Sequence, residues 1–156
     1  MPQQSPYRIF SPEEAGCLIA LCEQIIPADD APGATEAGVI YYIDATVARY
    51  FPDTKDRYHN GIASLQAHCQ AAHGQSFEAL SPTLRTEVVE RMETGSLPPE
   101  HWETISPQAF LTMVIRHTMQ GFYGPPRHGG NRNYASYRML KLDFPLVVGQ
   151  NRYSHG

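Results

Sequence analysis

Lysine is scarce in this sequence: only Lys55 and Lys141 occur among 156 residues, and the arginines are scattered. No basic run is available to neutralise a phosphate backbone, and the formal net charge is −4 at pH 7, so nucleic acid is a poor candidate partner. Every apolar run falls far short of the roughly 18 residues that a membrane-spanning helix needs. We therefore expect a protein that binds no nucleic acid and has no membrane span.

Residues 1–10 contain neither a twin arginine nor an apolar core. They do not read as a signal peptide, which needs a charged start followed by an apolar stretch. Three expectations for the location follow: the cytoplasm, export with the help of another protein, or the periplasm after removal of a leader.

The motifs of common catalytic and cofactor sites are missing as well. The sequence has no G-x-S-x-G, no P-loop and no G-x-G-x-x-G, which removes the usual signals for a serine nucleophile, a nucleotide phosphate and a flavin or nicotinamide fold. The conspicuous serines precede prolines, where a serine is better explained as a helix cap. We predict no catalytic and no cofactor-binding residue in this chain.

Cysteine is also scarce, and its spacing indicates no metal or cluster site. Cys17 and Cys22 lie five positions apart on an expected helix, about 140° around its axis, so they point apart and should not pair. Three buried thiols are favoured over one bridge to Cys69. His68 and His73 lie near Cys69, but their side chains diverge on a helix, and we predict no metal site.

What the sequence does contain is a series of well-marked helix starts. Ser11-Pro12-Glu13-Glu14 is a capping box with proline at the first helical position, and Ser-Pro recurs at 81–82 and 106–107. Apolar residues then recur three and four apart. We predict a single compact all-α domain over 11–145, with an N-terminal extension (1–10) and a C-terminal tail (146–156). Its five main helices should start near residues 12, 35, 54, 82 and 107.

A turn separates the first two expected helices. Asp29 and Asp30 precede Pro32-Gly33, a composition typical of turns. We expect Gly33 at positive φ, setting the angle between the two helices, and Thr35 as the cap of the second helix.

The fifth helix should end at Gly121, and a long loop rich in glycine, proline, arginine and aromatic residues follows it. Pro125, Pro126, Gly129 and Gly130 rule out regular helix, and the loop is too long for an idle connection. It could form an anion-binding nest beside its arginines or a rigid surface that fits another protein. The composition favours a partner interface. Its candidate residues are Phe122, Tyr123, Arg127, His128, Gly129, Gly130, Asn131, Arg132 and Tyr134.

Two stretches carry a recognisable pattern. Residues 23–44 contain Ile-Pro-x-Asp, Pro-Gly-Ala, Ala-Gly-Val and Ile-Asp, and residues 118–132 contain Thr-x-x-Gly and Gly-Gly-Asn. Tyr58-x-x-Gly61 and Phe77-x-x-Leu80 lie between them. Over residues 11–145 the chain resembles the gluconate 2-dehydrogenase subunit 3 family. Pro125 and His128 stand where that family usually has Asp and Tyr.

The resemblance implies a large partner subunit. Members of the family form complexes with an FAD-dependent dehydrogenase of the glucose–methanol–choline type, which oxidises a sugar, glycoside or sugar acid, and a cytochrome accepts the electrons in some complexes. The small subunit would hold no flavin and would support folding, stability or export of the catalytic subunit. A glucoside 3-dehydrogenase complex fits as well as a gluconate one. The alternatives are a stand-alone helical ligand-binding or interaction module, and a stand-alone enzyme with an unfamiliar site.

Overall fold

The computed structural model describes residues 5–140, 146–147 and 150–151. It is compact and helical, as predicted, and these residues form six α-helices joined by short 3₁₀ turns. The helices are α1 (Pro12–Ile25), α2 (Val39–Tyr50), α3 (Pro52–His73), α4 (Pro82–Thr94), α5 (Pro107–Tyr123) and α6 (Ala135–Met139). The 3₁₀ turns are η1 (Phe77–Ala79), η2 (Pro99–His101), η3 (Pro126–His128) and η4 (Arg132–Tyr134). One antiparallel pair of two-residue strands, β1 (Leu146–Val147) and β2 (Gln150–Asn151), follows α6.

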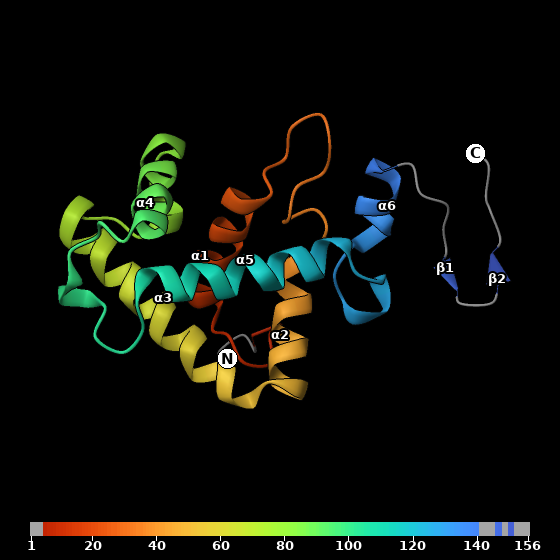
Figure 1. Cartoon of the computed structure of the whole chain (residues 1–156), viewed down its shortest axis with the longest axis horizontal. Helices are drawn as coiled ribbons and strands as arrows, with labels where there is room; N and C mark the ends of the chain where they lie inside the picture. Colours follow the sequence, from red (N-terminus) through yellow and green to blue (C-terminus); the bar gives the residue numbers. More distant parts are fainter. Residues whose placement is uncertain (1–4, 141–145, 148–149, 152–156) are drawn as a thin grey trace.

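Helix α5 is the central element and contacts each of the other five helices. Figure 1 shows it lying across the middle of the molecule, with α4 near one end and α6 near the other. Its inner face carries large apolar side chains such as Phe110, Val114 and Phe122, all fully buried. Because α5 contacts all five of the other helices, it connects them into one domain. No helix in the described part of the chain has the combination of length and apolar character needed to span a bilayer.

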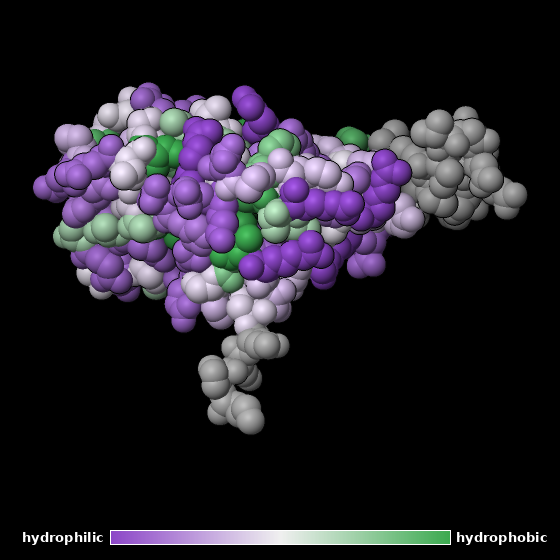
Figure 2. All heavy atoms as spheres, turned by 90° about the horizontal axis from the view of Figure 1, so that it is seen from below, coloured by the Kyte–Doolittle hydropathy of each residue, from purple (hydrophilic) through white to green (hydrophobic). Residues whose placement is uncertain are grey.

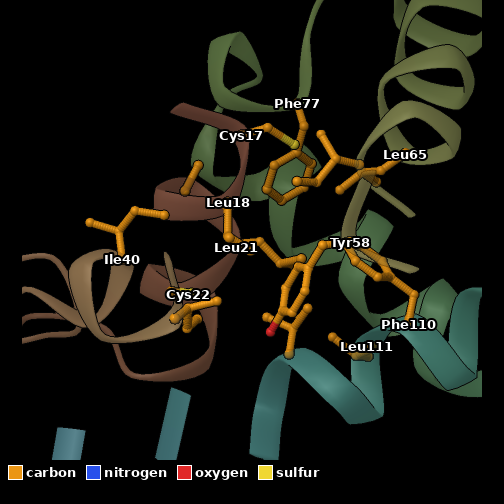
Figure 3. Close-up of a cluster of buried hydrophobic side chains, with 14 of the residues drawn as sticks. Cys17, Leu18, Leu21, Cys22, Ile40, Tyr58, Leu65, Phe77, Phe110 and Leu111 are labelled. Atoms are coloured by element: carbon orange, nitrogen blue, oxygen red, sulfur yellow. The ribbon is translucent and has the colours of Figure 1, made fainter. Parts of the chain in front are cut away.

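The core is formed where α1, α3 and α5 meet (Figure 3). Tyr58, Phe77 and Phe110 are fully buried there, beside Cys17 and Cys22 of α1.

All three cysteines are free and buried, as predicted. Burial raises the pKa of the Cys22 thiol to about 12, although a hydrogen bond from Thr118 partly opposes this. A thiol that stays protonated is unreactive, so these cysteines act as packing residues.

The predicted helix starts at residues 12, 82 and 107 are confirmed by their hydrogen bonds. The amide of Glu14 donates to the Ser11 hydroxyl at 3.1 Å, and the amide of Ser11 donates to the Glu14 carboxylate at 2.9 Å. Ser81 and Ser106 accept from backbone amides in the same way at the starts of α4 and α5. Each of these three helices begins where a serine side chain replaces a missing backbone partner.

The prediction that the fifth helix ends at Gly121 was wrong, because α5 continues to Tyr123 and its end is capped by Gly124. Gly121 has a different role. A Cβ there would lie 2.7 Å from the ring of Tyr42, so the missing side chain makes room for α2. The glycine therefore marks a helix contact and not a helix end.

The prediction that Thr35 caps the second helix was also wrong. Helix α2 starts at Val39, after Gly38 in the left-handed region with φ 70°. The amide of Thr35 donates instead to the Glu23 carboxylate of α1 at 2.9 Å. This bond holds residues 34–38 in a turn and delays the helix by four positions.

The expectation of positive φ at Gly33 was wrong, although a glycine is still required there. Its φ lies outside the left-handed region. A Cβ would lie 2.5 Å from the backbone nitrogen of Ala28 and 2.9 Å from the carbonyl oxygen of Ile26. The Glu23 carboxylate also accepts from the Ala28 amide at 2.8 Å. The turn is therefore closed by backbone contacts that leave no space for a side chain.

We expect Gly33→Ala to lower the free energy of unfolding by about 1–3 kcal/mol, because the added methyl group displaces backbone atoms. Gly16→Ala is the matched control: Gly16 lies inside α1 and a Cβ there meets nothing within 4 Å. That control should stabilise the domain by about 0.5–1 kcal/mol, since alanine favours a helix. Urea denaturation measures both. Equal midpoints for Gly33→Ala and the wild type would contradict the packing explanation.

Candidate functional site

The loop after α5 packs back across α2 and joins the two stretches that carry the sequence pattern. The amide of Arg132 donates to the carbonyl of Ala37 at 2.8 Å, across 95 positions of sequence. At the same crossing, a Cβ on Gly130 would collide with the carbonyl oxygen of Gly121 and lie 3.0 Å from the Cβ of Tyr42. Gly121 and Gly130 thus let the loop, α2 and α5 approach within backbone distance.

The side chain of Arg132 lies on α2. Its guanidinium carbon is 3.9 Å from the centre of the Tyr41 ring, a cation–π contact. A Cβ at Gly38 would lie 2.6 Å from its Nε atom, so that glycine also makes room for the arginine. Arg132 therefore contacts residues of its own chain. The loop thus has a structural role within the domain, which the sequence alone did not show.

Asn131 secures the loop from inside. Its side chain is fully buried, donates to the carbonyl of Gly124 at 2.8 Å and accepts from the amide of Ser136 at 2.8 Å. Asn131, Asn133 and Tyr134 all have positive φ, between 46° and 56°. Non-glycine residues adopt this conformation at a cost and keep it only where their surroundings hold them. The loop is thus a rigid, internally bonded structure.

This arrangement divides the predicted interface residues into buried, half-buried and exposed groups. Phe122, Gly130 and Asn131 are buried within the chain and shape the loop, so direct contact with a partner is not open to them. Gly129 and Tyr134 are half-buried. Tyr123 is 42% exposed. The exposed positions are Tyr123, Arg127, His128 and Arg132. The interface itself stays a prediction, now narrowed to these side chains.

His117 belongs to a buried hydrogen-bonded pair that the sequence did not identify. Its Nδ1 atom lies 2.7 Å from the hydroxyl oxygen of Tyr58, and its ring stacks on Phe51. Burial, together with the charges of Arg116 and Arg57, lowers the pKa of His117, and burial raises that of Tyr58. A neutral imidazole can accept a hydrogen bond from the Tyr58 hydroxyl group, so both polar groups of this buried pair have a partner. The Tyr-x-x-Gly pattern was the available signal for Tyr58.

Two open grooves flank the corner where α2 ends and α3 begins. One has a volume of about 480 Å³ and is lined by Arg57 and Arg116 beside His117. The other has a volume of about 270 Å³ and is lined by Arg8, Arg49 and Arg127. Among the residues that the structure describes, neither lining includes a carboxylate. Both grooves are therefore positively charged surfaces.

The described residues include no group of three or more histidine, cysteine, aspartate or glutamate side chains placed to hold a metal ion. His68, Cys69 and His73 do not form such a group. His68 and His73 meet edge to face, with ring centres 6.5 Å apart, and Cys69 is fully buried.

Comparison with known proteins identifies one family. The family model described as gluconate 2-dehydrogenase subunit 3 matches residues 12–143, a range that includes all six helices. No curated protein and no solved structure gives a significant match. Both stretches of the sequence pattern, and the crossing that joins them, lie inside the matched range.

We expect His117 to make the domain less stable as the pH falls. Because its pKa is lowered in the folded state, the unfolded chain binds more protons below about pH 6.5, and stability falls from there until the folded pKa is passed. The loss approaches about 1.4 kcal/mol per pH unit for one proton.

The measurement is the free energy of unfolding of wild type and His117→Gln between about pH 7.5 and about pH 5. Glutamine keeps an acceptor for Tyr58, so the variant should fold and show a shallower pH dependence. His68→Gln should remove a separate part of the slope, since burial lowers the pKa of His68 as well. Parallel curves for wild type and His117→Gln would refute the assignment.

Proposed function

Because the chain belongs to the gluconate 2-dehydrogenase subunit 3 family, we propose that it is the non-catalytic small subunit of an FAD-dependent dehydrogenase complex. Family membership implies a partner in a dehydrogenase complex. The proposed partner is a large flavoprotein of the glucose–methanol–choline type that oxidises a sugar, a glycoside or a sugar acid. FAD belongs to that subunit, and this chain supports its folding, stability or export. The observation that carries the proposal is the family match across the whole helical domain.

The structural role of the pattern residues supports a binding role over a catalytic one. Four of these residues allow the loop to pack closely against α2 and α5: Gly38, Gly121, Gly130 and Asn131. These pattern residues therefore specify a shape. A loop held rigid in advance loses little conformational entropy when a partner binds it.

An exposed apolar stripe on α5 leads to this loop. Ile115, Met119 and Tyr123 are spaced four apart and are 37%, 41% and 42% exposed, so they lie along one side of the central helix. Apolar side chains gathered on a surface mark contact with another protein. We propose that the stripe and the exposed side chains of the loop face the large subunit.

The isolated chain should be colourless and should not oxidise sugars with a dye acceptor, whereas co-expression with the neighbouring genes should yield a yellow complex on the tagged chain. A flavin absorbance band from the chain alone, or turnover by it, would contradict the assignment of FAD to the partner. Failure of the wild type to recover any flavoprotein would favour a stand-alone interaction module.

The double variant Tyr123→Ala/Arg127→Ala should stay folded by circular dichroism yet bind the large subunit at least about thirtyfold more weakly, the effect of losing roughly 2 kcal/mol. Arg127 is a cleaner choice than Arg132, whose loss would also loosen α2. The control is Arg91→Ala on α4, at the opposite end of the molecule (Figure 1). Equal recovery of flavoprotein by the double variant and the control would place the docking surface elsewhere.

A further inference from the structure

The corner between α2 and α3 presents two aromatic side chains to solvent. Tyr50 is the last residue of α2, and Phe51 caps it before α3 begins. Their exposed fractions are 57% and 45%, high values for large apolar side chains. Figure 2, viewed from the side of this corner, shows hydrophobic side chains exposed between hydrophilic ones. Exposed aromatics flanked by charge have the composition of the anchors in protein interfaces.

On one side of the corner, three arginines from distant segments meet at one groove. Arg8 is brought there because the buried Asp44 accepts the amides of Arg8 and Ile9 at 2.7 and 2.9 Å. Arg127 is brought there by η3, since the adjacent Gly129, at φ 97°, packs on the backbone of Tyr41. Arg49 comes from α2 itself. Among the described residues, none of these three guanidinium groups has an ion-pair partner.

On the other side, Arg57 and Arg116 line the second groove next to Phe51. They too lack an ion pair in the part of the chain that the structure describes. Asp53 and Asp56 share the first turns of α3 but line neither groove. The excess of arginine here contrasts with the formal net charge of −4 of the whole chain. Positive charge is therefore concentrated around the corner.

We propose that the α2–α3 corner docks an acidic patch on the large subunit, with Tyr50 and Phe51 inserted into an apolar recess and the arginines of both grooves bound to surrounding carboxylates. This inference rests on the proposed function. Guanidinium groups pair with carboxylates through two parallel hydrogen bonds. A single small anion would occupy one groove and leave the aromatic pair uncovered, so a protein surface fits the whole arrangement better.

Zero-length cross-linking in the complex provides the direct test. Arg49→Lys and Arg57→Lys keep the charge and add amines that a carbodiimide couples only to carboxylates in contact. Peptide mapping should find both new lysines joined to aspartate or glutamate of the large subunit. Arg91→Lys, on α4, is the matched control and should give no such product. A complex in which neither corner lysine is cross-linked to the large subunit would overturn the inference.

Binding measurements give a second readout. Arg49→Gln/Arg57→Gln should raise the Kd of the complex about tenfold or more, and the difference should shrink as salt screens the charges. Tyr50→Ala/Phe51→Ala should weaken binding at every salt concentration, because apolar contacts are not screened. Arg85→Gln/Arg91→Gln removes the same charge from α4 and should leave the Kd unchanged.

The possible results separate the two proposals. If the wild type forms the yellow complex and the corner variants bind as tightly as it does, the corner assignment is wrong and the proposed function stands. If inorganic phosphate shifts the amide signals of the corner in the isolated chain while the variants leave the complex intact, the grooves hold small anions and the inference is overturned. If the wild type recovers no flavoprotein, both proposals fail.

Discussion

The close crossing of the 129–132 loop over α2 and α5 is the contact on which the rest of this structure depends. Three glycines make it possible, because side chains at Gly38, Gly121 or Gly130 would overlap Arg132, Tyr42 or the backbone itself. The hydrogen bond from Arg132 to Ala37 then joins the loop after α5 to the turn that precedes α2. Because the loop and the two helices pack without space for further atoms, few alternative arrangements of these segments are possible. The surface that they form therefore has one defined shape.

Helix α2 provides several of the contacts that shape the proposed docking surface. Its buried Asp44 binds the backbone of the N-terminal segment, its Tyr41 supports Arg132, and its end forms the aromatic corner with Phe51. The five arginines around the corner come from five segments: the N-terminal segment, α2, α3, α5 and η3. Contacts with α2 place the N-terminal segment and η3, which carry Arg8 and Arg127. The proposed docking surface therefore depends on backbone contacts in the interior of the domain.

Much of the fold follows from local sequence. Serine, proline and glutamate side chains set the helix starts at residues 12, 82 and 107, and Gly74 and Gly95 end α3 and α4 in the left-handed conformation, because these effects act within a few residues. The predicted roles of two glycines were wrong. Gly33 was assigned to a positive φ and Gly121 to a helix end. Gly33 is required instead by the backbone of Ala28 and Ile26 in the same turn, and Gly121 by the ring of Tyr42 on another helix. A sequence shows that a glycine is present but not which group lies against it.

The candidate surface, too, could be predicted from the sequence only in part. The sequence by itself determined the helical class, the family pattern and the presence of a loop rich in arginine and aromatic residues, since composition and short-range spacing carry that information. Only the tertiary structure decided that Phe122 and Asn131 face inward, that Tyr58 bonds His117, and that Arg8, Arg49 and Arg127 share a groove. Those relations join residues tens of positions apart, and they exist only once α2, α5 and the loop have packed together.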